Sequence, residues 1–165
     1  MPLLNSNVMR KRQVMRKLLI VVLIAMACGC TKTENGLVFG IPDYEKRDIR
    51  VSQIDLDILN KANQLLSDER TWKKGHPSDC TKTEKLDLYC ALEKASLDVT
   101  GKYVHRQPAL QEVRFVIDDN YKNRWNKHRL IDFNSHKDTI FDDIKSVLNM
   151  AISTVRMKIT HNKRG

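Results

Sequence analysis

The four cysteines are the residues whose spacing points most directly to chemistry, and they form two pairs. Cys28 and Cys30 stand near the N-terminus, directly after an apolar run over residues 18–27, whereas Cys80 and Cys90 lie in the body of the chain. A cysteine can be acylated, bridged, bound to a metal or used as a nucleophile, and its surroundings decide among these. Because the two pairs have different surroundings, we expect different chemistry from each.

The first pair resembles the acylation site of bacterial lipoproteins. Five basic residues and no acidic residue occur in residues 1–27, and a small residue, Ala27 or Gly29, precedes each cysteine. A basic start followed by a short apolar stretch and small residues is typical of a cleaved signal peptide. The resemblance implies removal of residues 1–27 and lipid attachment at Cys28, with Cys30 as the alternative site. An uncleaved anchor and a buried core helix are the other interpretations, although ten residues of helix rise only about 15 Å and the run lacks the polar face of a core helix.

Export would place Cys80 and Cys90 in an oxidising compartment, where a disulfide is expected. A bridge needs Cα atoms within about 7 Å, but ten residues of continuous helix would separate them by about 15 Å. The sequence therefore predicts that Cys80 lies in a loop that folds back onto a helix carrying Cys90. Two buried free thiols are the alternative. A zinc site is not expected, because no second cysteine or histidine pair has the spacing of metal ligands.

Basic residues and one aromatic residue alternate in a segment predicted to connect two helices. Such a segment is first interpreted as a solvated loop without a partner, and the alternative is that it binds anionic groups through charge and stacking. For an exported protein we expect an anionic lipid headgroup or an acidic protein surface as the partner. Nucleic acid is not expected, because removal of residues 1–27 would lower the net charge from +9 to about +4. The candidate basic patch consists of Lys122, Arg124, Trp125, Lys127 and Arg129.

No motif in the sequence predicts catalysis or a cofactor. The five histidines are scattered, and none stands four residues from another on a predicted helix. Nucleophile elbows, glycine-rich phosphate loops and serine–lysine motifs with their companions are missing. Asp132 and Asn134 superficially resemble the start of a calcium loop, but its sixth position is Lys137 instead of glycine. We therefore predict no catalytic residue, metal or cofactor.

The elements that position these residues are predicted to be helices. A charged fraction of 30% with 41% hydrophobic residues excludes a wholly disordered chain, and 165 residues suffice for one domain. Ser52 with Asp55 and Thr139 with Asp142 resemble helix-capping pairs. The pattern favours an all-α fold with about four helices, at 52–68, 83–99, 108–120 and from 138 or 139 onward, with residues 121–138 as a connection. The predicted organisation is a signal peptide over 1–27, an acylated N-terminus and flexible tether over 28–51, a helical domain over 52–157, and a basic tail over 158–165.

Three motifs in the body resemble those of a family of small bacterial helical domains of unknown function. They are Trp72-Lys-Lys-Gly75, Cys90-Ala-Leu92 and Asp132-Phe-Asn134-Ser135, the last leading into residues 139–152. Phe133 stands where the family usually has tryptophan, and Ser135 where it has aspartate. The resemblance spans roughly residues 54–152 and implies an all-α fold without implying an activity.

The sequence as a whole predicts a lipoprotein of the cell envelope that displays a small, non-catalytic, protein-binding helical domain. Its expected partners are membrane lipid, through the acylated cysteine, and an envelope or secreted protein. Neither Cys28 nor Cys30 is followed by Asp, the residue that marks inner-membrane retention in some lipoproteins, which favours the periplasmic face of an outer membrane if the cell has one. The alternatives are a periplasmic inhibitor or immunity protein against a secreted toxin, and a regulator with an uncleaved anchor.

Overall fold

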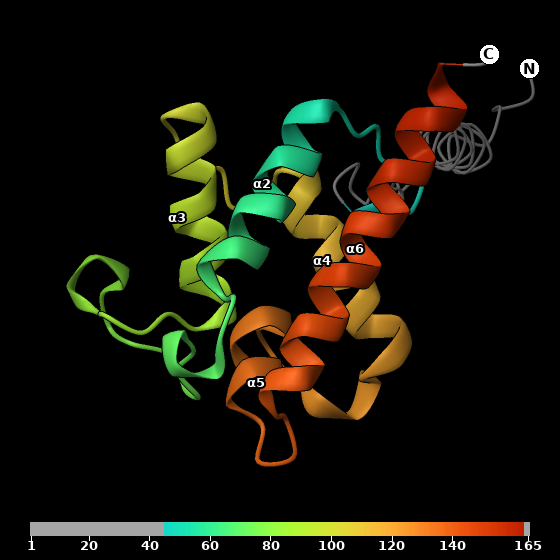
Figure 1. The fold of residues 1–165 in the computed structure, drawn as a ribbon. Helices are drawn as coiled ribbons and strands as arrows, with labels where there is room; N and C mark the ends of the chain where they lie inside the picture. The colour runs from blue at the N-terminus through green and yellow to red at the C-terminus, as the bar shows by residue number, and fades with distance from the viewer. Residues whose placement is uncertain (1–44, 164–165) are drawn as a thin grey trace, which may run out of the picture. The chain divides into compact units, whose positions relative to one another are not determined.

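A computed structural model describes residues 45–163, and it confirms the predicted all-α class (Figure 1). Within this range no strand is present, and the only β-type pairing is an isolated bridge between Trp72 and Leu86. The predictions for the signal peptide, for acylation at Cys28 or Cys30 and for most of the tether fall outside the described residues. The α-helices are α2 (Gln53–Leu65), α3 (Leu88–Thr100), α4 (Pro108–Asn120), α5 (Arg129–Ser135) and α6 (Phe141–Asn162).

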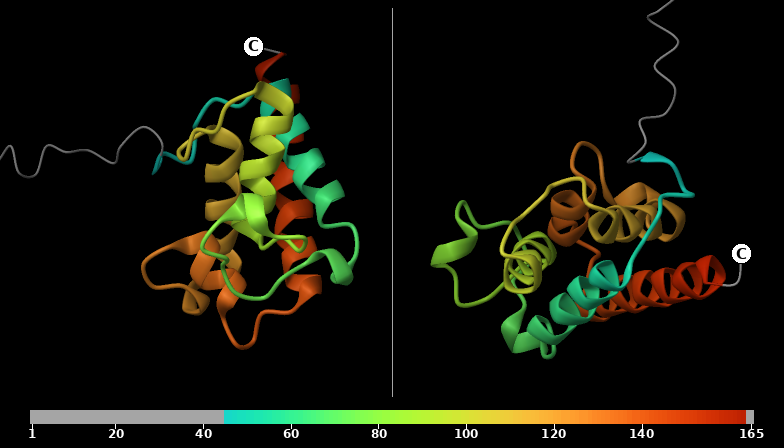
Figure 2. Two further views of the ribbon diagram at one scale, coloured as in Figure 1. Left: turned by 90° about the vertical axis from the view of Figure 1, so that its left-hand side faces the viewer. Right: turned by 90° about the horizontal axis from the view of Figure 1, so that it is seen from above.

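The helices pack around one apolar core. α2 lies between α3 and α6, α4 packs against α6, and the short α5 contacts α3 and α4 at one end of the bundle (Figures 1 and 2). No helix within residues 45–163 is long and apolar enough to cross a membrane. The core is formed by fully buried side chains from every helix, among them Leu59, Leu92, Ile117, Phe133 and Leu148.

The first predicted helix begins where its capping pair indicates. Ser52 is the N-cap of α2, and its backbone N–H and hydroxyl both donate to Oδ2 of Asp55 at 2.8 Å. The other carboxylate oxygen of Asp55 accepts the backbone N–H of Ala109 at 3.0 Å. One buried aspartate therefore joins the N-terminal ends of α2 and α4, and α4 begins with Pro108 in its first turn as predicted.

The second helix starts five residues later than the predicted Thr83. Leu86 is held in extended conformation, because its N–H donates to Thr71 O (2.9 Å) and its carbonyl accepts the N–H of Lys73 (3.0 Å). Asp87 then caps α3 by accepting the N–H of Cys90 at 2.7 Å. A pairing with a distant segment thus overrides the local helical pattern of residues 83–87. The helix ends at Gly101, which has a positive φ of 71° as helix-ending glycines often do.

The predicted connection over residues 121–138 contains two elements that the sequence analysis missed. Lys122–Arg124 forms a 3₁₀ turn, and Arg129–Ser135 forms α5, whose Leu130 and Phe133 are fully buried. The segment has only two large apolar side chains on its inner face, too few to produce a recognisable helical periodicity. Those two side chains fill the end of the core and fix α5 in place.

The last helix also differs from the prediction at both ends. It begins at Phe141, and Asp143 rather than Asp142 accepts the N–H of the N-cap residue Ile140, at 3.1 Å. The predicted capping pair of Thr139 and Asp142 is therefore wrong. The helix continues to Asn162, five residues into the predicted basic tail.

The predicted disulfide between Cys80 and Cys90 is present. The sulfur atoms are 2.05 Å apart and the Cα atoms 5.2 Å apart. Cys80 belongs to a 3₁₀ turn (Cys80–Lys82), and Cys90 lies in the first turn of α3. The bridge therefore fastens the long loop after α2 to the start of α3, in the geometry that the ten-residue spacing requires.

Candidate functional site

Within the described residues, a cluster of charged side chains surrounds a small cavity of about 150 Å³. Four cationic side chains and two histidines line it, against a single carboxylate. The residues come from the segment before α2, the loop between α3 and α4, α4 itself, the turn before α5, and the first residue of α5. We call this site the cationic pocket, and its lining consists of Glu45, His105, Arg106, Arg114, Trp125, Lys127, His128 and Arg129.

Arg114 carries a buried positive charge on the inner side of the pocket. It projects from α4, is 3% exposed, and donates to the carbonyl of His105 (3.0 Å) and to Oε1 of Gln111. None of the ion pairs among residues 45–163 includes it. Burial, with repulsion from Arg106, lowers the pKa of Arg114 to about 10, so it remains charged at neutral pH. A buried cation whose partners are all neutral is costly.

The single carboxylate of the pocket already occupies two of its arginines. Glu45 pairs with Arg106 through Oε1 and with Arg129 through Oε2, each at 2.9 Å. Arg129 also contacts Asp118 (3.1 Å), and its guanidinium lies 5.2 Å above the Trp125 ring centre. The pocket therefore contains one position at which an anionic group binds two cations at once, as bidentate carboxylates commonly do.

Asp132 shapes the turn that brings the last four lining residues together. Its Oδ2 accepts the backbone N–H groups of Asn126 (3.0 Å), Lys127 (2.7 Å) and His128 (2.9 Å). Burial alone would raise the pKa of Asp132, but these three donors outweigh it and lower that pKa. An aspartate that superficially suggests a calcium loop in the sequence thus serves to fold the turn.

A chain of hydrogen bonds leads from Arg114 through His105 to the partly buried Tyr103 and Tyr89, and it fixes the state of His105. Arg114 Nη2 lies 3.3 Å from His105 Nε2, and the Tyr103 hydroxyl lies 3.0 Å from His105 Nδ1. The Tyr103 hydroxyl in turn donates to Tyr89 at 3.0 Å. Since arginine can only donate, Nε2 accepts and the proton is assigned to Nδ1 of a neutral imidazole. Burial, followed by the hydrogen bond to Tyr89, raises the pKa of Tyr103 and keeps it a donor.

His128 is the second imidazole of the pocket, with its ring centre 5.5 Å from that of His105. Its Nδ1 accepts the N–H of Ile131 at 3.3 Å, which assigns the proton to Nε2. Burial and then the charge of Arg114 lower the pKa values of both histidines. The free pocket therefore resists additional positive charge.

The structure brings together three residues of the predicted basic patch and separates two. Trp125, Lys127 and Arg129 line the cationic pocket, but Lys122 and Arg124 do not. Arg124 instead pairs with Asp143 at 2.7 Å and stacks over Tyr121. A contiguous run of basic residues is therefore a poor guide to a shared site, because the 3₁₀ turn directs its first part elsewhere.

Sequence reasoning missed the lining residues that lie far along the chain from the patch, namely Glu45, His105, Arg106 and Arg114, and it assigned no role to His128 within the patch. One of them left a signal. Arg114 follows Leu110 by four residues and precedes Ile117 by three, so it occupies the apolar stripe of the helix over 108–120. A charged residue on the buried face of a helix indicates either a buried partner or a ligand.

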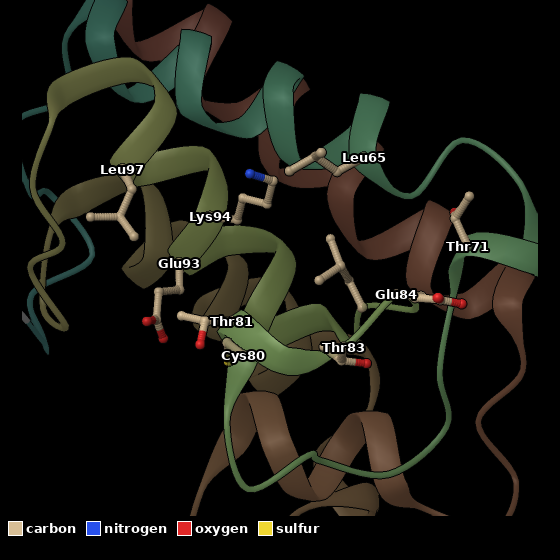
Figure 3. A pocket seen from close by; sticks show the side chains of 10 residues that line it. Leu65, Thr71, Cys80, Thr81, Thr83, Glu84, Glu93, Lys94 and Leu97 are labelled. Carbon is tan, nitrogen blue, oxygen red and sulfur yellow. The ribbon is translucent and has the colours of Figure 1, made fainter.

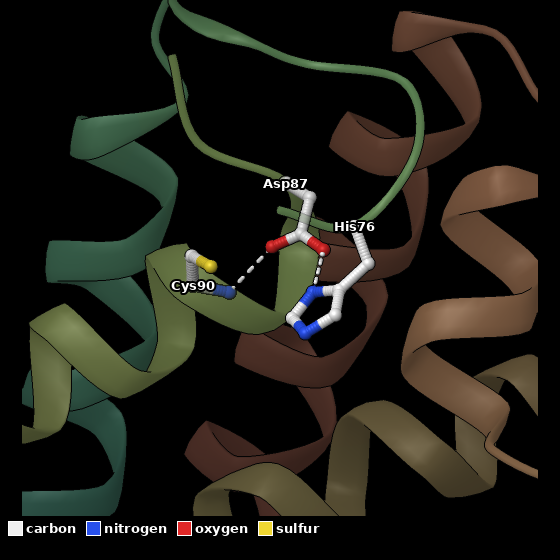
Figure 4. A group of neighbouring side chains, drawn as sticks. All are labelled: His76, Asp87 and Cys90. Carbon is white, nitrogen blue, oxygen red and sulfur yellow. Dashed lines mark hydrogen bonds and ion pairs between the residues drawn. The ribbon is translucent and has the colours of Figure 1, made fainter. Parts of the chain in front are cut away.

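A second cluster, of His76, Asp87 and Cys90, has donor atoms within 4.8 Å of one another (Figure 4). Its groups already have structural roles. The Asp87 carboxylate accepts the N–H of Cys90 and lies 2.7 Å from His76 Nδ1, and the Cys90 sulfur belongs to the disulfide. Metal binding uses a thiolate, so the bridged sulfur offers none, and the arrangement serves as a helix cap.

The Trp72 and Asn134 motifs meet in the interior. Asn134 Oδ1 accepts from Trp72 Nε1 (2.8 Å) and from the backbone N–H of Leu88 (3.1 Å), while its Nδ2 donates to the carbonyl of Lys73 (3.0 Å). Asn134 is fully buried. We call these four residues the Asn134 clamp. It joins the loop after α2 to the start of α3 and to α5, which is a structural role.

A larger hollow of about 450 Å³ lies beside the disulfide, between α2, α3 and the loop that joins them (Figure 3). Leucine and threonine side chains supply most of its lining. Its charged side chains, Glu84, Glu93 and Lys94, have opposite signs and are spread along the hollow. The hollow therefore does not have a predominant charge, whereas the cationic pocket is mainly positive.

Comparison with known proteins supports the resemblance seen in the motifs. The model of a family of unknown function (DUF6197) matches residues 51–154, more than half of the chain. No curated protein and no solved structure was found to match the chain. The matched region contains the whole Asn134 clamp and every lining residue of the cationic pocket except Glu45.

Proposed function

The chain belongs to this family of unknown function, and we propose that it is a lipid-anchored protein of the cell envelope whose helical domain binds an anionic group on an envelope or secreted partner. The observation that carries the binding role is the cationic pocket, in which Arg114 is buried without a carboxylate partner. Uncompensated buried charge is costly to the fold, and such charge is characteristic of sites that meet a ligand.

Two features support the envelope location. The apolar run over residues 18–27 directly precedes Cys28 and Cys30, and basic residues precede the run. The body carries a disulfide between Cys80 and Cys90, and such bridges persist mainly in exported proteins. One acyl chain anchors a protein only marginally, but the several chains of a lipoprotein-type cysteine give stable residence at a membrane.

The lining of the pocket supports binding rather than turnover. Among its described lining residues there is no serine, threonine or cysteine that could act as a nucleophile. Both ring nitrogens of His105 are occupied by Arg114 and Tyr103, so this imidazole is held in place instead of being available for proton transfer. These features suit a site that holds an anionic group without reacting with it.

Palmitate labelling in a bacterial host tests the anchor. The wild-type chain should incorporate label and lose residues 1–27, whereas Cys28→Ala/Cys30→Ala should incorporate none. The single variants assign the acylated cysteine. Cys80→Ala/Cys90→Ala is the matched control and should be labelled like the wild type. A wild-type chain without label that still begins at Met1 would contradict the lipoprotein and indicate an uncleaved anchor.

A further inference from the structure

We propose that the cationic pocket is a binding site for a phosphoryl group, and that Glu45 occupies part of this site as a built-in competitor when the ligand is absent. The inference deepens the proposed binding role by naming the chemistry of the group that enters the pocket. It does not depend on the acyl anchor, because binding is measured on the protein in solution.

The distribution of charge favours a phosphoryl group over a carboxylate. A carboxylate is already present, and it pairs with Arg106 and Arg129 alone. Arg114 and Lys127 also line the pocket but form none of the ion pairs among residues 45–163. A phosphate monoester carries a charge of about −1.5 to −2 at neutral pH and three acceptor oxygens. It can therefore meet more of the four cations than one carboxylate does.

The hydrogen-bond donors around the pocket exceed the acceptors that it contains. A guanidinium has five N–H donors, and the contacts of Arg114 with His105 and Gln111 use three of them. The indole Nε1 of Trp125 is buried and has no acceptor within the described part of the chain. His128 is assigned its ring proton on Nε2, a further donor. A group that consists of acceptor oxygens complements this lining.

The size of the pocket limits the ligand to a single anionic group. Sites for drug-sized molecules occupy about 300–1,000 Å³, and the cationic pocket has about 150 Å³. A water molecule takes up about 30 Å³ in the liquid, so there is room for one tetrahedral oxyanion and a few waters. The rest of a larger ligand, such as a lipid or sugar, would remain outside the pocket.

Glu45 holds the place that such a ligand would take. Its two oxygens bridge Arg106 and Arg129 across the pocket. It lies ahead of α2 and is not part of the apolar core, so the carboxylate can leave without disturbing the core. Removal of this carboxylate should strengthen phosphate binding, which is the reverse of what is expected for a ligand-binding residue.

Isothermal titration calorimetry on the full chain, purified in a non-ionic detergent without phosphate, tests the site with inorganic phosphate as probe. Saturable binding to the wild type is expected. Glu45→Gln should tighten binding about threefold to tenfold, and Lys127→Gln should weaken it by a similar factor. Lys122→Gln is the matched control, because Lys122 is an exposed lysine of the same segment outside the pocket. Its affinity should equal that of the wild type.

Two sources of the group are distinguished by a second titration with glycerophosphoglycerol, the soluble headgroup of an anionic phospholipid. If inorganic phosphate binds about tenfold more tightly, the ligand is a free phosphate or a phosphate monoester. If the headgroup binds at least as tightly, the ligand is a lipid diester. Either result supports the proposal when it depends on Lys127.

Three results would overturn the proposal. The first is no saturable binding of either probe up to about 20 mM. The second is equal weakening by Lys122→Gln and Lys127→Gln, which would reveal general attraction to a basic surface. The third is an unchanged affinity in Glu45→Gln, which would remove Glu45 from the site. A folded Glu45→Gln variant, shown by an unchanged circular dichroism melt, keeps the third result decisive.

Discussion

The Asn134 clamp and the cationic pocket both place polar groups inside the protein, but only the clamp satisfies them. Asn134 makes three hydrogen bonds of 2.8–3.1 Å and leaves no polar atom of its side chain without a partner. In the pocket, by contrast, Arg114 lacks a carboxylate partner and the Trp125 indole N–H lacks an acceptor. Buried polar groups in native proteins are almost always paired, so the clamp is complete without a ligand and the pocket is not.

This difference distinguishes the structural role of the family motifs from the binding role proposed for the pocket. The Trp72 and Asn134 motifs carry the resemblance to the family, and they fasten the loop after α2 to α3 and α5. The pocket residues come from four separate parts of the sequence and carry none of the family motifs. The motifs therefore identify the fold, whereas the imbalance of charge and donors identifies the site.

The largest effect is expected from breaking the clamp. Asn134→Ala leaves the buried Leu88 N–H and the partly buried Trp72 indole and Lys73 carbonyl without partners, and an unsatisfied group costs about 1–3 kcal/mol when buried and less where water reaches it. We expect the free energy of unfolding to fall by about 3–4 kcal/mol, measured by urea denaturation. Asn123→Ala, at an exposed asparagine, is the control and should change it by less than about 0.5 kcal/mol.

The same variant sharpens the contrast with the pocket. At temperatures where Asn134→Ala is still folded, phosphate affinity should match that of the wild type, because none of the lining residues belongs to the clamp. A variant of wild-type stability would show that the three hydrogen bonds do not hold the loop. A folded variant without phosphate binding would show that the two regions are one coupled unit.

The second prediction concerns the disulfide, which reinforces the clamp side of the molecule. A bridge that closes a loop of about ten residues stabilises a protein by about 3 kcal/mol in the chain-entropy description. Cys80→Ala/Cys90→Ala should therefore lower the free energy of unfolding by about this amount. Dithiothreitol should destabilise the wild type by up to about this amount and leave the double variant unchanged.

That internal control distinguishes the bridge from the packing of the cysteine side chains. Cys90 is fully buried, so its truncation carries a packing cost even when no bridge exists. A loss of stability in the variant with no effect of dithiothreitol on the wild type would assign the whole effect to packing. It would also weaken the argument for an oxidising compartment.

Much of the helical architecture could be predicted from the sequence because local signals determine it. Ser52 with Asp55, Pro108 and Gly101 mark three helix boundaries by capping, ring geometry and a left-handed backbone. The start of α3 could not be predicted, because Leu86 pairs with a segment more than ten residues away. Neither could α5, whose short length leaves too little periodicity to detect.

The site was less predictable than the fold because only part of it has a local pattern. Trp125, Lys127 and Arg129 are close in sequence, and their basic run indicated an anion-binding segment. Arg114 and Glu45 join them only through the packing of α4 and the path of the chain before α2. A charged site whose residues are distant in sequence can be recognised only from the three-dimensional structure.

The smallest predicted effect comes from the histidines of the pocket. Burial and the charge of Arg114 lower the pKa values of His105 and His128 below the ordinary value of about 6.5. Between the lowered values and 6.5 the unfolded chain binds more protons than the folded one, so stability rises with pH through that window. The contribution is complete above about pH 6.5 and is lost as the pH falls. The charged and titratable groups that face the two rings are Arg106, Arg114, Tyr89, Tyr103, Asp132 and His76, together with each ring for the other.

This effect should amount to no more than about 1 kcal/mol, because both rings are only partly buried. It is measured as the difference in urea-unfolding free energy between pH 7.5 and pH 5.5, for the wild type and for His105→Gln/His128→Gln. The double variant should lose the part of the pH dependence that comes from the two rings. Phosphate should raise both histidine pKa values, because an anion offsets the repulsion from Arg114. The pKa values are measured from the pH dependence of the imidazole NMR chemical shifts. If phosphate does not change the histidine pKa values, the anion does not bind in the pocket, and the positive charge of Arg114 is not neutralised by it.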